Sequence, residues 1–247
     1  GRGGWQSRAV LDAAKLRKVE TQGAPLQTAL GVLGMPGMTA YAGIVGIGRP
    51  EPGQTVVVGA ASGAVGAVAG QIARRLGCRV VGVAGGAAKC RYVEAELGFD
   101  ACLDRREADL AGRLNEACPQ GVDVYVELTG GEVLWATLPL LNQGARIPVI
   151  GGISWYNLPA LPEGPDRTPL LMRAILTKRL LVQGMIVWDW AHLEAAFRRE
   201  VGAWVQDGSL RYREDVVEGL ENAPAAFIGL LEGRNFGKLL VKVGPEP

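Results

Sequence analysis

One short stretch near the first quarter of the chain constrains the fold more than any other. Residues 55–59 read TVVVG, a β-branched run typical of a strand buried on both faces of a parallel sheet. Residues 64–76 follow with helical spacing and stop at Gly77, a residue that favours the end of a helix. A strand, a turn of small residues and a helix in this order predict a βαβ unit.

The same alternation continues along the chain. We expect further strands at residues 79–84, 101–104, 122–128 and 145–150, the last broken by Pro148, and helices at 87–97, 107–117 and 132–141. This order predicts an α/β fold with a doubly wound parallel sheet. Beyond a proline-rich loop at 155–166, we expect helices at 168–179, 191–205 and 222–231, and strands at 180–187, 212–218 and 238–243.

The turn after the first strand has the spacing of a nucleotide-binding turn. In VVVGAASGAVG, Ala61, Gly63 and Gly66 form the pattern A-x-G-x-x-G between the predicted strand and helix. Small residues let the backbone approach a pyrophosphate, and the free N–H groups of the first helical turn face its charge. The flanking elements favour a dinucleotide site over a glycine-rich turn without a ligand.

The end of the second predicted strand indicates which dinucleotide binds. An NAD site places Asp or Glu there, whereas this chain reads VAGGAAKCR, with Lys89 and Arg91 in the following helical turn. A cation at this position suits the 2′-phosphate of NADP, so the sequence favours NADP(H). The alternative is that these charges form an ordinary solvated helix face.

Composition excludes several other classes of protein. A net charge of +1 gives no field to recruit nucleic acid or an anionic membrane, and the uncharged run 54–73 lacks the Leu, Ile and Phe of a membrane span. Four well-separated cysteines predict reduced thiols in a cytoplasmic protein. His192 is the only histidine, so we expect no metal site, and without a G-x-S-x-G elbow we expect no Ser-His-Asp hydrolase. Chemistry without a metal or a nucleophile on a dinucleotide fold favours hydride transfer by the cofactor.

Longer motifs carry a family resemblance. LGMPGMTAY at 33–41, ISWYN at 153–157, REDVVEGLENAP at 213–224 and NFGK at 235–238 are similar to the zinc-independent medium-chain dehydrogenase/reductases, in the branch of NADPH-dependent alkenal/one double-bond reductases. The resemblance implies a Rossmann domain at 35–208, flanked by remnants of a GroES-like β-rich lobe at 1–34 and 209–247. Because relatives carry a further half-domain before GRGGWQ, we expect this sequence to lack the N-terminal part of the family fold.

The resemblance also implies roles for individual residues. Tyr156 would lie near the cofactor ribose and substrate carbonyl as the catalytic candidate, although a loop tyrosine can also merely pack. Lys89 would bind the 2′-phosphate, while Met35, Thr39, Asn235 and Gly237 would line the nicotinamide pocket. The remaining predicted cofactor-binding residues are Ala61, Ser62, Gly63, Ala64, Val65, Gly66, Gly85, Arg105 and Ile153.

Several positions depart from the family pattern. Arg105 stands where relatives have a tyrosine near the adenosine phosphate, and its planar guanidinium can keep that contact. Leu128 replaces an asparagine near the cofactor, and Ile150 replaces a cysteine. Met185 and Trp188 change the wall on the substrate side, which leaves the substrate open.

The resemblance implies NADPH-dependent reduction of the carbon–carbon double bond of α,β-unsaturated ketones or aldehydes, with hydride transfer to the β-carbon. The alternatives are a quinone or carbonyl reductase of the same fold and a non-catalytic NADPH-binding protein. The expected partners are a small enone or enal and a second copy of the chain, because the uncharged segment 180–188 predicts an exposed sheet edge that pairing would cover.

Overall fold

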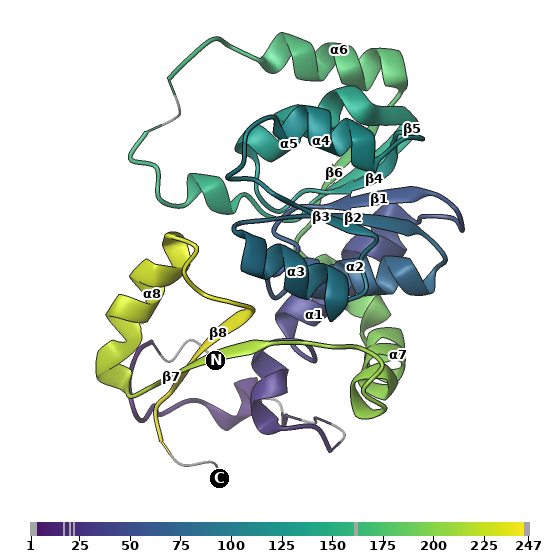
Figure 1. Cartoon of the computed structure of the whole chain (residues 1–247). Coiled ribbons are helices and arrows are strands. Elements are labelled where there is room, and N and C mark those ends of the chain that lie inside the picture. The colour runs from purple at the N-terminus through teal and green to yellow at the C-terminus, as the bar shows by residue number, and fades with distance from the viewer. Residues whose placement is uncertain (1–3, 17, 20, 22, 161–162, 245–247) are drawn as a thin grey trace.

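Six parallel strands form the central sheet, in the order β3-β2-β1-β4-β5-β6 (Figure 1). The computed structural model describes residues 4–16, 18–19, 21, 23–160 and 163–244, so residues 161–162 of the predicted loop and the extreme ends of both flanks lie outside the described residues. The strands are β1 (Thr55–Val58), β2 (Arg79–Ala84), β3 (Ala101–Asp104), β4 (Val122–Val126), β5 (Leu141–Val149) and β6 (Leu181–Gly184). The strand order reverses between β1 and β4, which confirms the predicted doubly wound sheet.

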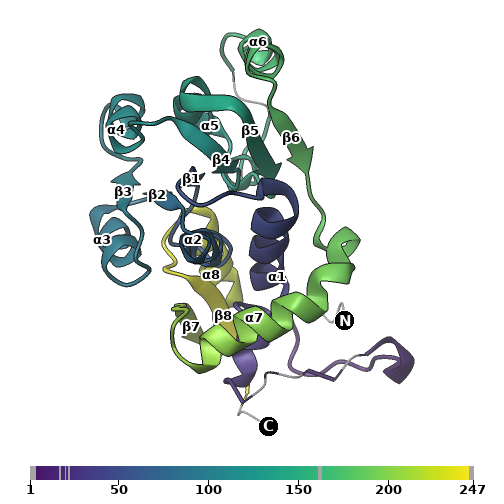
Figure 2. The same cartoon turned by 90° about the vertical axis from the view of Figure 1, so that its right-hand side faces the viewer.

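Helices cover both faces of this sheet (Figures 1 and 2). One face carries α1 (Met35–Tyr41), α2 (Gly66–Arg75), α3 (Ala87–Ala95) and α7 (Glu194–Gln206), and the other carries α4 (Leu110–Ala117), α5 (Gly131–Thr137) and α6 (Thr168–Lys178). Alternate residues of β1 pack on opposite faces of the sheet. Val56 and Val58 belong to the apolar core on one face, and Val57 belongs to the core on the other. The uninterrupted valine run is therefore explained by burial on both faces.

Several predicted elements differ in the structure. The strand expected at 180–187 is limited to Leu181–Gly184, and the helix expected at 191–205 begins at Glu194, after a 3-10 turn at Val187–Leu193. The helix expected at 132–141 ends at Thr137 and continues as a short 3-10 turn, Leu138–Leu140, because Pro139 lacks the N–H that an α-helix needs. Strand β5 begins earlier than expected, and Pro148 does not break it. The carbonyl of Pro148 accepts a hydrogen bond from the N–H of Glu127 at 3.0 Å, so the strand keeps its pairing there.

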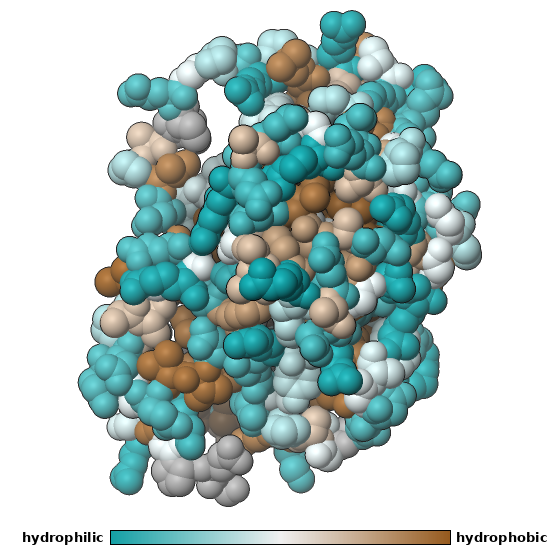
Figure 3. All heavy atoms as spheres, viewed as in Figure 1, coloured by the Kyte–Doolittle hydropathy of each residue, from teal (hydrophilic) through white to brown (hydrophobic). Residues whose placement is uncertain are grey.

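A second, two-stranded parallel sheet lies beside the first (Figure 1). It consists of β7 (Glu214–Glu218) and β8 (Lys238–Lys242), connected by α8 (Ala223–Leu231). Figure 3 shows hydrophobic side chains gathered over this unit, where Phe227 and Ile228 are 45% and 52% exposed. In the part of the chain that the structure describes, no helix has the length and apolar character needed to cross a bilayer.

Candidate functional site

A cleft of about 1020 Å³ lies between the main sheet and the β7–β8 unit. On one side it is lined by residues that follow the carboxyl ends of β1, β2, β4, β5 and β6, and on the other by residues of α8 and β8. In a doubly wound sheet, ligands bind outside the carboxyl ends of the strands where the strand order reverses. The cleft occupies that place.

The turn between β1 and α2 leaves no room for a side chain at the point where α2 begins. A Cβ atom on Gly66 would lie 2.5 Å from the carbonyl oxygen of Ala60. Gly82 of the neighbouring strand is equally constrained, because its Cβ would lie 2.8 Å from the Cβ of Ala61. Ala61 is fully buried and does not line the cleft, so its small size serves packing of the turn against β2.

The start of α2 presents backbone donors to the cleft. Ala64, Val65 and Gly66 line it, and among the described residues their N–H groups donate no hydrogen bond to another backbone carbonyl. Free N–H groups at a helix N-terminus carry partial positive charge and favour an anion such as a pyrophosphate. This cradle fits the predicted dinucleotide.

Three cations gather where β2 and β3 end. Lys89, Arg105 and Arg106 line the cleft around Gly85, and the ammonium of Lys89 donates a 2.7 Å hydrogen bond to the carbonyl of Gly233. Burial, followed by the charges of Arg106 and Arg105, lowers the pKa of Lys89. An anion held here relieves that repulsion, so this end fits a phosphate.

At two basic residues near this end, the structure differs from what the sequence predicts. Arg91 is exposed on α3 and does not line the cleft. Arg106 was not assigned, although the second basic residue of the triplet Asp104-Arg105-Arg106 was the signal that could have found it.

The opposite end of the cleft is ordered by a buried carboxylate that sequence reasoning did not assign. Oε1 of Glu127 accepts hydrogen bonds from the N–H groups of Thr129 and Gly130, both at 2.7 Å, and Oε2 accepts one from the hydroxyl of Tyr125 at 3.1 Å. Burial raises the pKa of Tyr125, which keeps its proton for this bond. The carboxylate thereby fixes the turn that presents Leu128 to the cleft.

Around Leu128 the cleft wall is mainly apolar. It includes Ile150, Met185 and Trp188, three of the family departures found in the sequence. Tyr156 stands at the same end with a side chain that is 67% exposed, and its hydroxyl has no hydrogen-bond partner among the described residues. A phenol beside apolar walls can donate a hydrogen bond to a carbonyl oxygen.

The loop that carries Tyr156 is fixed by its neighbours. The indole of Trp155 covers Gly130 so closely that a Cβ there would lie 2.5 Å from the ring. The hydroxyl of Ser154 donates a hydrogen bond to the carbonyl of Thr129. Across the cleft, the side-chain amide of Asn235 donates to the carbonyl of Gly237 at 2.9 Å.

All predicted site residues except Ala61 line this one cleft: Met35, Thr39, Ser62, Gly63, Ala64, Val65, Gly66, Gly85, Lys89, Arg105, Ile153, Tyr156, Asn235 and Gly237. The described residues contain no group of three or more His, Cys, Asp or Glu side chains placed to hold a metal ion. The absence of a metal cofactor stays a prediction.

Comparisons with known proteins fit this arrangement. The family described as zinc-binding dehydrogenase matches residues 64–201. The NADPH-dependent curcumin reductase of Escherichia coli is 52% identical over 247 residues, all of this chain and 72% of that protein. A 2-alkenal reductase (NADP⁺-dependent) of Nicotiana tabacum is 41% identical over all of this chain and 71% of its own length.

A solved structure agrees in both sequence and fold. The crystal structure of CurA from Vibrio vulnificus in complex with NADPH superposes with a TM-score of 0.89 at 50% identity, covering 94% of this chain and 69% of that one. The chain belongs to the medium-chain dehydrogenase/reductase family, in the branch of NADPH-dependent curcumin and alkenal reductases. For this reductase, the predicted fold class, oxidoreductase activity and NADPH cofactor are confirmed at the level of the family.

Proposed function

We propose that the reductase reduces the carbon–carbon double bond of α,β-unsaturated ketones and aldehydes, with hydride addition at the β-carbon. The observation that carries this proposal is a single cleft with a three-cation end, a backbone N–H cradle and an apolar end bearing Tyr156. Bound NADPH supplies the hydride. The curcumin and 2-alkenal reductases that the chain is similar to support this class of substrate.

The residues of the cofactor end bind and orient. The N–H groups at the start of α2 hold the pyrophosphate, and Lys89 and Arg105 hold the 2′-phosphate. Met35, Thr39 and the Asn235–Gly237 turn form the pocket for the nicotinamide ring. Fixing the ring against the substrate removes much of the entropic barrier to reaction.

Tyr156 acts on the substrate oxygen. Its hydroxyl donates a hydrogen bond to the substrate carbonyl and stabilises the negative charge that the oxygen gains when hydride reaches the β-carbon. The resulting enolate takes a proton at its α-carbon from Tyr156 or from a water molecule. Leu128 and Ile150 give this end of the cleft an apolar wall beside which an uncharged substrate can lie.

The larger organisation of the protein is part of the proposal. Residues 35–208 serve as the cofactor domain, and residues 1–34 and 209–247 belong to the β-rich catalytic lobe. Strand β6 is the edge of the six-stranded sheet, with Leu181 and Val182 each 39% exposed, and a second copy pairs along it to form a homodimer. The four free cysteines accord with a cytoplasmic location.

A panel of three substrates tests the reaction. We expect NADPH oxidation with an aryl enone and formation of the saturated ketone, followed by absorbance and mass spectrometry. A quinone consumed faster than the enone would favour a quinone reductase, and an allylic alcohol product would favour a carbonyl reductase. NADPH binding without turnover of any of the three substrates would favour a non-catalytic NADPH-binding protein. Sedimentation with and without Val182→Lys tests the dimer, which the added charge should dissociate.

A further inference from the structure

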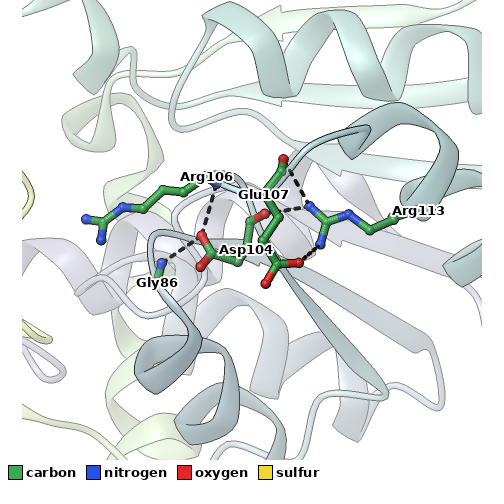
Figure 4. A network of polar contacts seen from close by, with 5 residues as sticks. All are labelled: Gly86, Asp104, Arg106, Glu107 and Arg113. Atoms are coloured by element: carbon green, nitrogen blue, oxygen red, sulfur yellow. Dashed lines mark hydrogen bonds and ion pairs between the residues drawn. The ribbon is translucent and has the colours of Figure 1, made fainter.

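The turn that follows β3 is held by one carboxylate oxygen. Oδ1 of Asp104 accepts hydrogen bonds from the backbone N–H of Gly86 at 2.8 Å and from that of Arg106 at 3.0 Å (Figure 4). These bonds lower the pKa of Asp104, the bond from Arg106 most. The backbone N–H of Arg105 also donates a 2.9 Å hydrogen bond to the carbonyl of Ala84, which joins the segment after β3 to the end of β2. The ends of β2 and β3 are therefore locked together.

Helix α4 fixes the other side of this turn. The guanidinium of Arg113 donates a 2.6 Å hydrogen bond to the carbonyl of Asp104 and forms an ion pair with the carboxylate of Glu107 at 2.5 Å (Figure 4). The side chain of Arg106 extends away from both carboxylates in the same view. Glu107 is thus paired with Arg113, which leaves the guanidinium of Arg106 available to a ligand.

The locked turn places two guanidinium groups over the end of β2. A Cβ on Gly85 would lie 3.6 Å from the Nε atoms of both Arg105 and Arg106, and one on Gly86 would lie 3.3 Å from Nη1 of Arg106. Neither guanidinium forms an ion pair with another described residue. Together with Lys89, they form a cluster of three cations. The carboxylates of Asp104 and Asp215 act on Arg106 and Lys89 only through longer-range attraction, without an ion pair among the described residues.

We infer that Arg106 binds the cofactor 2′-phosphate beside Lys89 and Arg105, and that Asp104 is the positioning residue that holds Arg106 there. The inference rests on the use of NADPH in the proposed function. A dianionic phosphate matches the fork of a guanidinium and relieves the mutual repulsion of three cations. The neutral 2′-hydroxyl of NADH neither matches the guanidinium fork nor relieves the repulsion. All three cationic side chains therefore contribute to the preference for NADPH over NADH.

Calorimetric titration of the whole chain with 2′,5′-ADP and with 5′-AMP tests Arg106 without any turnover. We expect Arg106→Gln to weaken 2′,5′-ADP binding about tenfold, the size of one charge-assisted contact, and to leave 5′-AMP binding unchanged. The matched control is Arg91→Gln, which removes the same charge from the exposed face of α3. Equal affinities of the two variants for 2′,5′-ADP would overturn the inference.

Two substitutions of Asp104 separate positioning from folding. Asp104→Asn keeps a side-chain oxygen that can accept both N–H groups and removes a negative charge near the phosphate, so we expect 2′,5′-ADP affinity equal to or above that of the unmodified chain. Asp104→Ala should lower the ratio of 2′,5′-ADP to 5′-AMP affinity about fivefold. An unchanged ratio in Asp104→Ala, or equal loss in both variants, would contradict the positioning role. Failure of enone reduction would overturn the proposed reaction and leave these binding results intact.

Discussion

The two ends of the cleft are built by different means. At the cation end, Asp104 and Arg113 anchor the turn through backbone hydrogen bonds, and the side chains that face the ligand are charged. At the apolar end, Glu127 anchors the turn after β4, but the side chains around it are Leu128, Ile150 and the exposed Tyr156. Each end thus has a carboxylate that holds backbone rather than ligand.

The difference between the ends concerns what each can recognise. Charged groups on a fixed frame discriminate strongly between a phosphate and a hydroxyl. Apolar walls discriminate weakly between substrates that differ by a methylene group, by about 1–3 kcal/mol. We therefore expect strict cofactor selection at the cation end and broad acceptance of uncharged enones at the apolar end.

A substitution in the turn that both ends share should have the largest effect. Gly66→Ala places a Cβ against the carbonyl of Ala60, so the turn must move away from the pyrophosphate. We expect NADPH binding to weaken about a hundredfold, measured by quenching of protein fluorescence. Gly244→Ala is the control, because a Cβ there meets no atom within 4 Å and the residue lies outside the β6 edge. Similar losses in both variants would contradict the special role of this turn.

The next effect isolates the cation end. Lys89→Gln should weaken NADPH binding about twentyfold and leave NADH binding unchanged, since only NADPH carries the 2′-phosphate. Lys242→Gln, which breaks an exposed ion pair with Glu218, should change neither affinity. If Lys89→Gln weakened the binding of NADPH and NADH equally, the assignment of Lys89 to the 2′-phosphate would be contradicted.

A third substitution isolates the apolar end. Tyr156→Phe removes only the hydroxyl, so kcat for an enone should fall about tenfold while the Kd for NADPH stays the same. Steady-state kinetics and cofactor titration give both quantities. An unchanged kcat would assign the carbonyl hydrogen bond to a water molecule instead.

The smallest expected effect is a pH dependence at the cation end. Burial and the two arginines lower the pKa of Lys89, so it loses its proton at a lower pH than an ordinary lysine. Its contribution to phosphate binding is present below that pKa and is lost as the pH rises through it, which should weaken NADPH about threefold in the alkaline range. Lys89→Arg should remove this dependence, and its persistence would point to another group.

Elements set by local spacing could be predicted from the sequence, whereas elements set by packing could not. The glycine-rich turn and its flanking elements depend on local spacing, and β1, β2 and their helices formed as expected. Helix α1 and the π-helix Ala42–Gly48 were not predicted, because AGIVGIG has no helical pattern of its own. Packing decides that segment, where Gly46 lies against the ring of Trp190.

Residues whose position depends on a neighbouring strand were also missed. Arg106 reaches the cleft only because β3 pairs with β2, with Asp104 beside Ala84. Glu127 acts on backbone two and three residues further along a turn, a geometry that spacing alone does not reveal. Lys89 could be assigned from the residues themselves, because a cation stands where an NAD site has an acid, whereas Tyr156 could be assigned only because the resemblance supplied it.

The most direct test of the central claim follows the hydride itself. The intact chain is incubated with an aryl enone and NADPH that carries deuterium at the transferred position, and the product is analysed by NMR and mass spectrometry. We expect a saturated ketone with one deuterium at the β-carbon, as hydride addition at that carbon requires. Deuterium at the carbonyl carbon of an allylic alcohol, or no deuterium in any product, would contradict it.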